Sequence, residues 1–144
     1  MTRLLEDGHF FFPGPTEVRG EILAAMPRPM IPHRGPEFER LFAALQAGLR
    51  PTFRTRRPVF VSSSSATGLM EAGVRSAPSG PVLALVSGAF AERFAHVARS
   101  CGRSVEALTA EWGGVVPLDA VEARLKLGRF SVVTVVHSET STGA

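Results

Sequence analysis

The 144-residue sequence contains almost no cysteine and no long apolar run, and each scarcity excludes a class of protein. Its one cysteine, Cys101, can form no internal disulfide and supplies no cysteine-based metal cluster, so we predict no metal site. No apolar run approaches the ~20 residues that a membrane-spanning helix needs. Glu6 and Asp7 also interrupt the apolar layout of a signal peptide. The sequence therefore predicts a cytoplasmic protein without a membrane partner.

Lysine and aspartate are also scarce, although charge of both signs is present. The 16 basic and 13 acidic residues give a net charge of +3, but Lys126 is the only lysine, and Asp7 and Asp119 are the only aspartates. The one basic cluster is RTRR at residues 54–57, and only two phenylalanines flank it. Nucleic-acid binding would need aromatic stacking residues joined to such a cluster on one face. We therefore expect a solvated or anion-facing loop there and no nucleic-acid partner.

The residues that are plentiful indicate a folded α/β protein, since 44% are hydrophobic and 20% are charged. Residues 1–57 form a proline-rich leading segment and helices, of which the clearest starts at Pro36. From residue 58 onward, expected helices alternate with expected strands at 59–61, 81–86, 104–108 and 132–136. Residues 81–86 are apolar at consecutive positions, which favours a strand buried on both faces. The alternation predicts a mostly parallel sheet with helices on both faces.

A polar loop at residues 64–68 opens the first expected helix of this part of the chain. Free backbone N–H groups and the positive end of a helix dipole attract a phosphate, and Ser65 and Thr67 add hydroxyl donors. The loop lacks the glycines and the lysine of a P-loop and does not match a dinucleotide fingerprint. For this loop alone, a polar helix cap without a ligand remains the simpler interpretation.

Two further loops follow expected strands and leave similar alternatives open. Phe90, just after residues 81–86, could stack on a flat heterocycle at the ligand-binding edge of the sheet, or could join Phe94 and Val97 in the core. The hydroxyls of residues 140–142 could donate to a ligand oxygen, or could belong to an ordinary loop. None of the three loops decides the function by itself.

Six short motifs nevertheless follow one another in a fixed order between about residues 12 and 143. They are PGPT at 13–16, MIPHRGPEF at 30–38, SATGLMEA at 65–72, SGAFAER at 87–93, EWG at 111–113 and HSETSTG at 137–143. In this order and spacing the chain resembles class V aminotransferases of the alanine–glyoxylate and serine–pyruvate type, which depend on pyridoxal 5′-phosphate and have fold-type I. The resemblance implies that residues 1–57 supply substrate-side and dimer-interface elements. It also implies that residues 58–144 form the first half of the cofactor-binding α/β domain, which is incomplete at the C-terminus.

The resemblance assigns cofactor contacts to five residues. Ser65, Ala66 and Thr67 match the loop that holds the cofactor phosphate. Phe90 matches the aromatic residue that stacks on the pyridine ring, and Thr140 matches the residue that donates to the 3′ oxygen of the ring. Glu139 lies in the same motif as Thr140, and we assign it no catalytic role.

The resemblance also assigns residues to the substrate side and to the subunit interface. Pro13, Gly14 and Pro15 match the stretch that lines the substrate pocket. His33 and Arg34 match an active-site loop at the interface of the homodimer that the intact enzyme is expected to form.

No catalytic residue is predicted within the chain, because the family's reactive lysine and the aspartate that binds the pyridine nitrogen match positions beyond residue 144. Lys126 is expected in a surface helix, and neither Asp7 nor Asp119 follows a core strand. The implied reaction moves an amino group from a small amino acid, of the alanine or serine type, to a 2-oxo acid of the glyoxylate or pyruvate type. The chain is expected to be an N-terminal fragment that is inactive alone. The alternatives are a lyase or desulfurase of the same fold type, or a non-catalytic remnant or interaction module.

Overall fold

The computed structural model describes residues 13–144, which fall into one unit that ends at Val61 and a second unit formed by Ser62–Ala144. Residues 1–12, at the start of the expected leading segment, lie outside the described residues. None of the helices in the described part of the chain combines the length and the apolar character that crossing a membrane requires.

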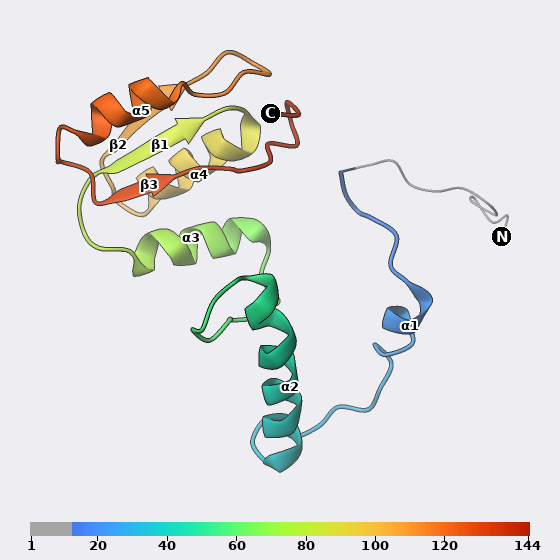
Figure 1. Cartoon of the computed structure of the whole chain (residues 1–144). Helices are drawn as coiled ribbons and strands as arrows, with labels where there is room; N and C mark the ends of the chain where they lie inside the picture. Colours follow the sequence, from blue (N-terminus) through green and yellow to red (C-terminus); the bar gives the residue numbers. More distant parts are fainter. Residues whose placement is uncertain (1–12) are drawn as a thin grey trace, which may run out of the picture. The chain divides into compact units, whose positions relative to one another are not determined.

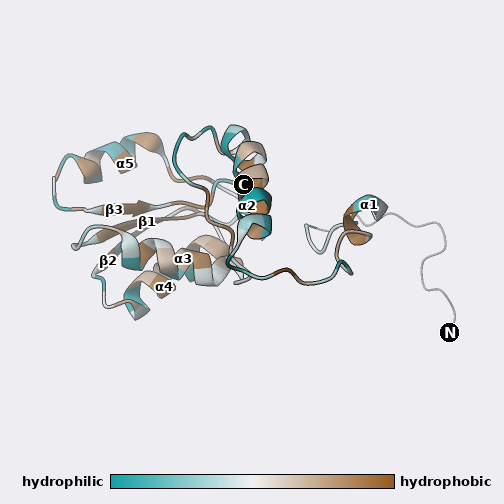
Figure 2. Ribbon diagram, turned by 90° about the horizontal axis from the view of Figure 1, so that it is seen from below, coloured by the Kyte–Doolittle hydropathy of each residue, from teal (hydrophilic) through white to brown (hydrophobic). Residues whose placement is uncertain are grey.

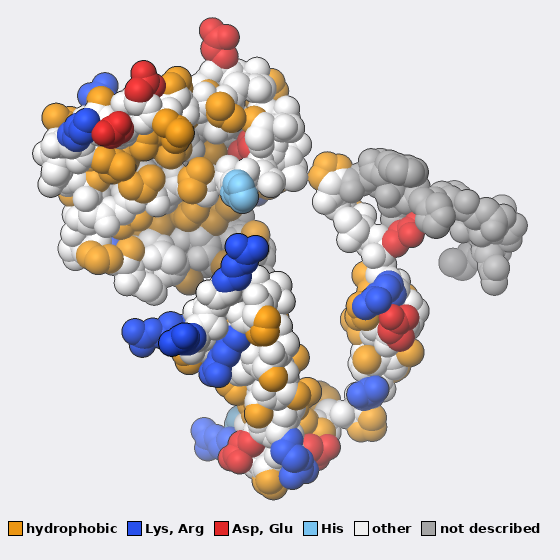
Figure 3. All heavy atoms as spheres, in the orientation of Figure 1, with side chains coloured by type: hydrophobic (Ala, Val, Ile, Leu, Met, Phe, Trp, Pro, Cys, Tyr) orange, Lys and Arg blue, Asp and Glu red, His pale blue; other side chains and the backbone are white. Residues whose placement is uncertain are grey.

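The first unit contains the helices α1, Gly20–Leu23, and α2, Pro36–Thr52 (Figure 1). The predicted start of α2 is confirmed, since Pro36 occupies its first turn, where no intrahelical donor is needed. The apolar stripe of α2 is not buried within this unit, and Figure 3 shows hydrophobic side chains on the visible surface of the helix. The exposed large apolar side chains of α2 are Phe38, Leu41, Phe42 and Leu45.

The prediction of a strand at residues 59–61 is wrong. The side-chain amide of Gln46 takes the place of a neighbouring strand: its Nε2 donates to the carbonyl of Val59 at 2.8 Å, and its Oε1 accepts from the N–H of Val59 at 2.9 Å. Gln46 is buried, so this pair satisfies polar groups that would otherwise be costly. The backbone of Val59 therefore finds its partners on α2 and not in a sheet.

The second unit alternates helices and strands, and its strands form one parallel sheet in the order β2-β1-β3. Val82 of β1 lies opposite Val105 of β2 and Val132 of β3. Figure 2 shows α5 over one face of the sheet and α3 and α4 over the other, so the predicted α/β class with helices on both faces is confirmed. The elements are α3 (Ala66–Ser76), β1 (Val82–Val86), α4 (Ala89–Ser100), β2 (Val105–Thr109), α5 (Leu118–Leu125) and β3 (Val132–Thr134).

The core is centred on β1, which is buried on both faces as its apolar run predicts. Val82, Leu83 and Ala84 are completely buried. Alternate residues of β1 pack against α4, which presents small side chains at Ala91 and Ala95 and so approaches the sheet closely. The central strand and α4 therefore supply most of the buried apolar side chains among the described residues.

The third strand is shorter than predicted, because pairing with β1 ends at Thr134 and not at residue 136. Beyond β3, Val136 packs against the cluster of β1 and α4 side chains. The hydroxyl of Thr142 then donates to the carbonyl of Ser87, just after β1, at 3.1 Å. The segment 137–144 thus leaves the sheet and lies against the turn between β1 and α4.

The C-terminal end of α3 is held near the N-terminal ends of the strands, away from the segment 137–144. The guanidinium of Arg103, between α4 and β2, donates to the carbonyls of Val74 at 3.0 Å and Ala77 at 2.8 Å. It also donates to the carbonyl of Pro78 at 2.8 Å, beside the start of β1. Since α3 ends where β1 begins, its first turn lies on the side where β1 ends, as Figure 1 shows.

Candidate functional site

The first turn of α4 is held by a carboxylate from the segment 137–144. The N–H groups of Phe90 and Ala91 donate to the two carboxylate oxygens of Glu139 at 3.3 and 2.9 Å. The N–H of Ala89 donates to the hydroxyl oxygen of Ser141 at 2.9 Å, and that hydroxyl donates to Glu139 at 2.6 Å. The donors of this turn, which a helix leaves unpaired, are thus satisfied by residues about fifty positions away.

Glu139 is ionised at this position although its side chain is almost completely buried, with 1% of the residue exposed. Burial by itself would raise the pKa of the carboxyl. The hydrogen bonds that it accepts from the hydroxyl of Ser141 and from three backbone N–H groups outweigh burial and hold the pKa below its ordinary value. The positive end of the α4 dipole favours the same charge state.

Gly88 permits this close approach. A Cβ at Gly88 would lie 2.5 Å from Cγ of Glu139 and 2.5 Å from the hydroxyl oxygen of Ser141. The cap residue of α4 is this glycine, which has no side chain to satisfy the first turn. The missing cap is the sequence signal that could have indicated a structural role for Glu139 and Gly88, which were not predicted site residues, and for Ser141, whose hydroxyl was considered only as a donor to a ligand.

The first turn of α3 is satisfied less completely. Ser65 caps the helix, and its hydroxyl oxygen accepts from the N–H of Gly68 at 3.3 Å. Among the described residues, the N–H groups of Ala66 and Thr67 and the hydroxyl of Thr67 form no hydrogen bond. Ser65 and Ala66 are exposed to solvent. This helix start therefore presents two backbone donors and a hydroxyl to any anion that approaches.

The structure places two of the predicted contacts, Phe90 and Thr140, near the end of β1. Phe90 is the second residue of α4 and keeps 39% of its surface exposed, so it does not join the core as the alternative interpretation had it. The guanidinium of Arg93 lies 5.5 Å from the centre of its ring. Thr140 is exposed and lies between Glu139 and Ser141, both of which bond to the first turn of α4. Phe90 and Thr140 are thus brought together, and the start of α3 lies at the same side of the sheet.

The other predicted residues belong to the first unit. Pro13, Gly14 and Pro15 are exposed, and so are His33 and Arg34 in the loop before α2. Their assignment to a substrate pocket and to a subunit interface stays a prediction.

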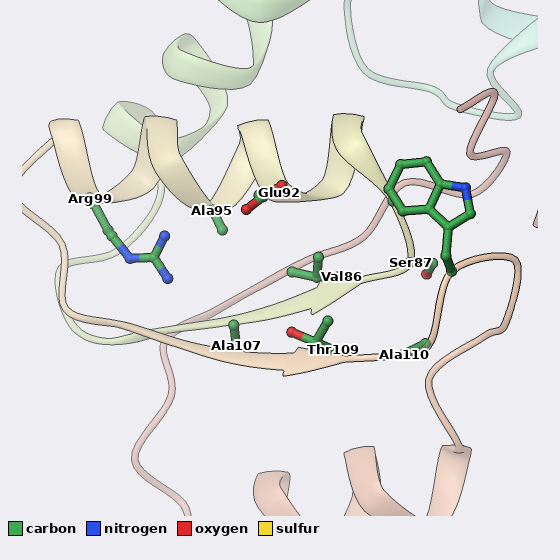
Figure 4. Close-up of a pocket in the computed structure, with 10 residues that line it drawn as sticks. Val86, Ser87, Glu92, Ala95, Arg99, Ala107, Thr109 and Ala110 are labelled. Atoms are coloured by element: carbon green, nitrogen blue, oxygen red, sulfur yellow. The ribbon is translucent and has the colours of Figure 1, made fainter. Parts of the chain in front are cut away.

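A cavity of about 250 Å³ lies between α4 and β2, as Figure 4 shows. Small side chains, Ala95 from α4 and Ala107 from β2, leave this space open, and Trp112 also lines it. None of the five residues predicted to contact the cofactor lines it. This cavity is therefore separate from the side chains of the candidate site.

The only lysine of the chain lies outside this arrangement. Lys126 follows α5 directly, has 73% of its side chain exposed and forms an ion pair with Glu122 at 2.8 Å. Among residues 13–144, the end of β1 thus gathers hydroxyls, backbone donors and an aromatic ring, but no lysine.

Comparison with known proteins finds relatives named as aminotransferases, together with two named as soluble hydrogenase subunits, although no protein-family model matches the chain. An uncharacterised aminotransferase of Methanocaldococcus jannaschii is 36% identical over 135 residues, which cover 92% of this chain and 35% of that protein. A serine–glyoxylate aminotransferase of Hyphomicrobium methylovorum is 33% identical over 141 residues, which cover 94% of this chain and 35% of that protein. The chain thus spans about a third of the length of these relatives.

The same relationship is found among solved structures. The crystal structure of an alanine–glyoxylate aminotransferase from Nostoc superposes with a TM-score of 0.85 at 33% sequence identity, over 92% of this chain and 36% of that one. The homologues of this chain, in sequence and in structure, therefore include aminotransferases of the alanine–glyoxylate and serine–glyoxylate types, as its six motifs predict.

Proposed function

We propose that this chain is a portion of a pyridoxal 5′-phosphate-dependent class V aminotransferase. The proposed reaction moves an amino group from a small amino acid, of the alanine or serine type, to a 2-oxo acid of the glyoxylate or pyruvate type. The names of the relatives support the reaction class. The observation that carries the proposal is the open first turn of α3, which lies at the same side of the sheet as Phe90 and Thr140.

The phosphate of the cofactor fits the start of α3. Ala66 and Thr67 offer backbone N–H groups without partners among the described residues, and the hydroxyl of Thr67 adds a third donor. The helix dipole favours an anion there, and no acidic side chain in the first turn of α3 opposes it. Gly68 keeps the turn compact, since a Cβ at that position would lie 2.0 Å from the hydroxyl oxygen of Ser64.

The ring of the cofactor fits the start of α4. The half-exposed ring of Phe90 offers a face for offset stacking, and Arg93 lies over the same aromatic group. The exposed hydroxyl of Thr140 is free to donate to the oxygen on the ring. When bound, pyridoxal phosphate supplies the electron sink of the reaction. The residues of this chain would hold and orient it, and the reactive amine would come from residues other than the ion-paired Lys126.

The residues of the first unit complete the proposal. Pro13, Gly14 and Pro15 would line the substrate pocket, and His33 and Arg34 would lie at the interface of a homodimer. These roles rest on the resemblance of the motifs at residues 13–16 and 30–38.

Binding of pyridoxal phosphate to the ¹⁵N-labelled 144-residue chain tests the proposal. We expect saturable shifts of the amide signals of Ala66, Thr67 and Phe90. Thr67→Val removes a hydroxyl donor to a charged phosphate and should weaken binding about tenfold, equivalent to ~1.4 kcal/mol. Thr109→Val, the same change on β2, should leave binding unchanged. Absence of saturable shifts at these three amides in the unmodified chain would contradict the proposed function.

A further inference from the structure

We propose that Glu139 is a positioning residue of the cofactor site, which fixes Phe90 and Thr140 in one arrangement without touching the cofactor. This inference rests on the proposed function, because it concerns how the ring-binding side of that site is held. The carboxylate is buried and belongs to none of the predicted cofactor contacts.

The first step is the link from Glu139 to Phe90. Both carboxylate oxygens accept from consecutive backbone N–H groups, those of Phe90 and Ala91. These two N–H groups belong to the two peptide units that flank the Cα of Phe90, so the carboxylate holds the backbone on both sides of that Cα. The Cα of Phe90, and with it the direction in which the ring leaves the helix, is therefore set by this carboxylate.

The second step is the link from Glu139 to Thr140. Thr140 follows Glu139 directly and precedes Ser141, whose hydroxyl bonds both to Glu139 and to the N–H of Ala89. The carbonyl of Glu139 also accepts from the N–H of Gly143 at 2.8 Å, which closes the segment into a turn. Thr140 is thus held on both sides although its own side chain is exposed.

The third step concerns where the cofactor phosphate can bind. A carboxylate already occupies the first turn of α4, so a second anion there would meet like charge and no free donor. The first turn of α3 is the one of the two that remains open. Glu139 therefore directs the phosphate to α3 while it holds the ring-binding residues at α4, which gives the site a fixed direction for the cofactor.

The test compares two probes on the 144-residue chain, inorganic phosphate and pyridoxal phosphate. Inorganic phosphate reports the α3 turn alone, whereas pyridoxal phosphate also needs Phe90 and Thr140. Glu139→Gln keeps the size of the side chain but places an amide group against backbone N–H donors. We expect this variant to bind pyridoxal phosphate about tenfold more weakly, or worse, than the unmodified chain. Its affinity for inorganic phosphate should change by less than about twofold. Glu92→Gln, the same change at an exposed position of α4, should alter neither affinity.

Glu139→Gln could also prevent folding, so Ser141→Ala provides a milder second variant. It removes the hydroxyl that joins Ala89 to Glu139 and leaves the carboxylate in place. We expect the same selective loss of pyridoxal phosphate affinity at a smaller size.

The outcomes separate this inference from the proposed function. Unchanged pyridoxal phosphate affinity in a folded Glu139→Gln or Ser141→Ala chain would overturn the positioning role alone. An equal loss of affinity for inorganic phosphate and for pyridoxal phosphate would overturn it as well, because Glu139 would then support only the fold. If the unmodified chain binds inorganic phosphate but shows no added affinity for pyridoxal phosphate, the proposed function itself fails.

Discussion

The first turns of α3 and α4 begin on the same side of one parallel sheet, yet their backbone donors are satisfied in opposite ways. In α4, Glu139 and Ser141 occupy the donors from within the protein. In α3, only the short-range cap by Ser65 is present, and the next two N–H groups have no partner among the described residues. A helix start that is filled from within can serve as a rigid wall, whereas one that is left open can receive a ligand.

The difference in burial explains why the two turns do not share one solution. A buried carboxylate is tolerated only where hydrogen bonds compensate the loss of water, and Glu139 accepts such bonds from two backbone N–H groups of α4 and from Ser141. The start of α3 is exposed, so water can satisfy its donors until an anion replaces the water. The filled turn is therefore expected to be far more sensitive to mutation than the open one.

Removing the internal anion should have the largest effect. Glu139→Ala leaves three backbone donors and the hydroxyl of Ser141 without their buried acceptor, and we expect the free energy of unfolding to fall by about 3 kcal/mol. Urea unfolding followed by far-ultraviolet circular dichroism measures this change.

The control for that experiment is Glu92→Ala, at an exposed residue of α4, which should change stability by less than ~0.5 kcal/mol. Acetate has the size of the atoms that Glu139→Ala removes, so it should restore part of the lost stability, and acetamide should not. Similar losses for Glu92→Ala and Glu139→Ala would contradict the special role of the buried carboxylate.

Crowding the same contact from the other side should have the next largest effect. Gly88→Ala places a Cβ within 2.5 Å of both Cγ of Glu139 and the hydroxyl oxygen of Ser141, so one of the three groups must move. We expect a loss of about 2 kcal/mol in the free energy of unfolding. Gly73→Ala, in α3 with open space around it, is the matched control and should be neutral or stabilising. A neutral Gly88→Ala chain would show that the contact is loose.

The fold of the second unit could be predicted from the sequence because its signals are local and regular. The apolar run at β1 and its alternation with helices fix the α/β class without knowledge of any long-range contact. Residues 59–61 have a similar apolar composition but form no strand, because the backbone of Val59 pairs with the side chain of Gln46. Local pattern cannot show which partner a backbone segment finds.

The candidate site could be predicted only where resemblance supplied the roles. The spacing of the sequence could not decide whether Phe90 belongs to the core or contacts a ligand. In the structure, 39% of its surface is exposed. Glu139 could not be interpreted from spacing, because its partners Phe90 and Ala91 lie 49 and 48 residues away. A carboxylate just after a core strand, together with a helix whose cap is Gly88, is the combination that would have indicated it.

Weakening the open turn should cost less than disturbing the filled one. Ser65→Ala removes the acceptor for the N–H of Gly68, and an exposed N-cap of this kind contributes about 1 kcal/mol. Urea unfolding should show that smaller loss, and Ser65→Asp should retain most of the stability because aspartate also caps helices. Ser76→Ala, at the other end of α3, is the control. A loss as large as that of Glu139→Ala would remove the proposed difference between the two turns.

The smallest effect is a pH dependence that only the filled turn should show. The pKa of Glu139 is lower in the folded chain than its ordinary value of 4.5, so its contribution to stability is complete above that value and is lost as the pH falls through the folded pKa. The first turn of α3 contains no acidic group and should not titrate in this window. The difference in unfolding free energy between the unmodified chain and Glu139→Gln should therefore be constant from about pH 7 to 5 and should narrow as the pH falls below 4.5 and through the lowered pKa of the folded chain. Urea unfolding at a series of pH values measures it, and a difference that stays constant or widens on acidification would show that Glu139 is not held as the anion at the start of α4.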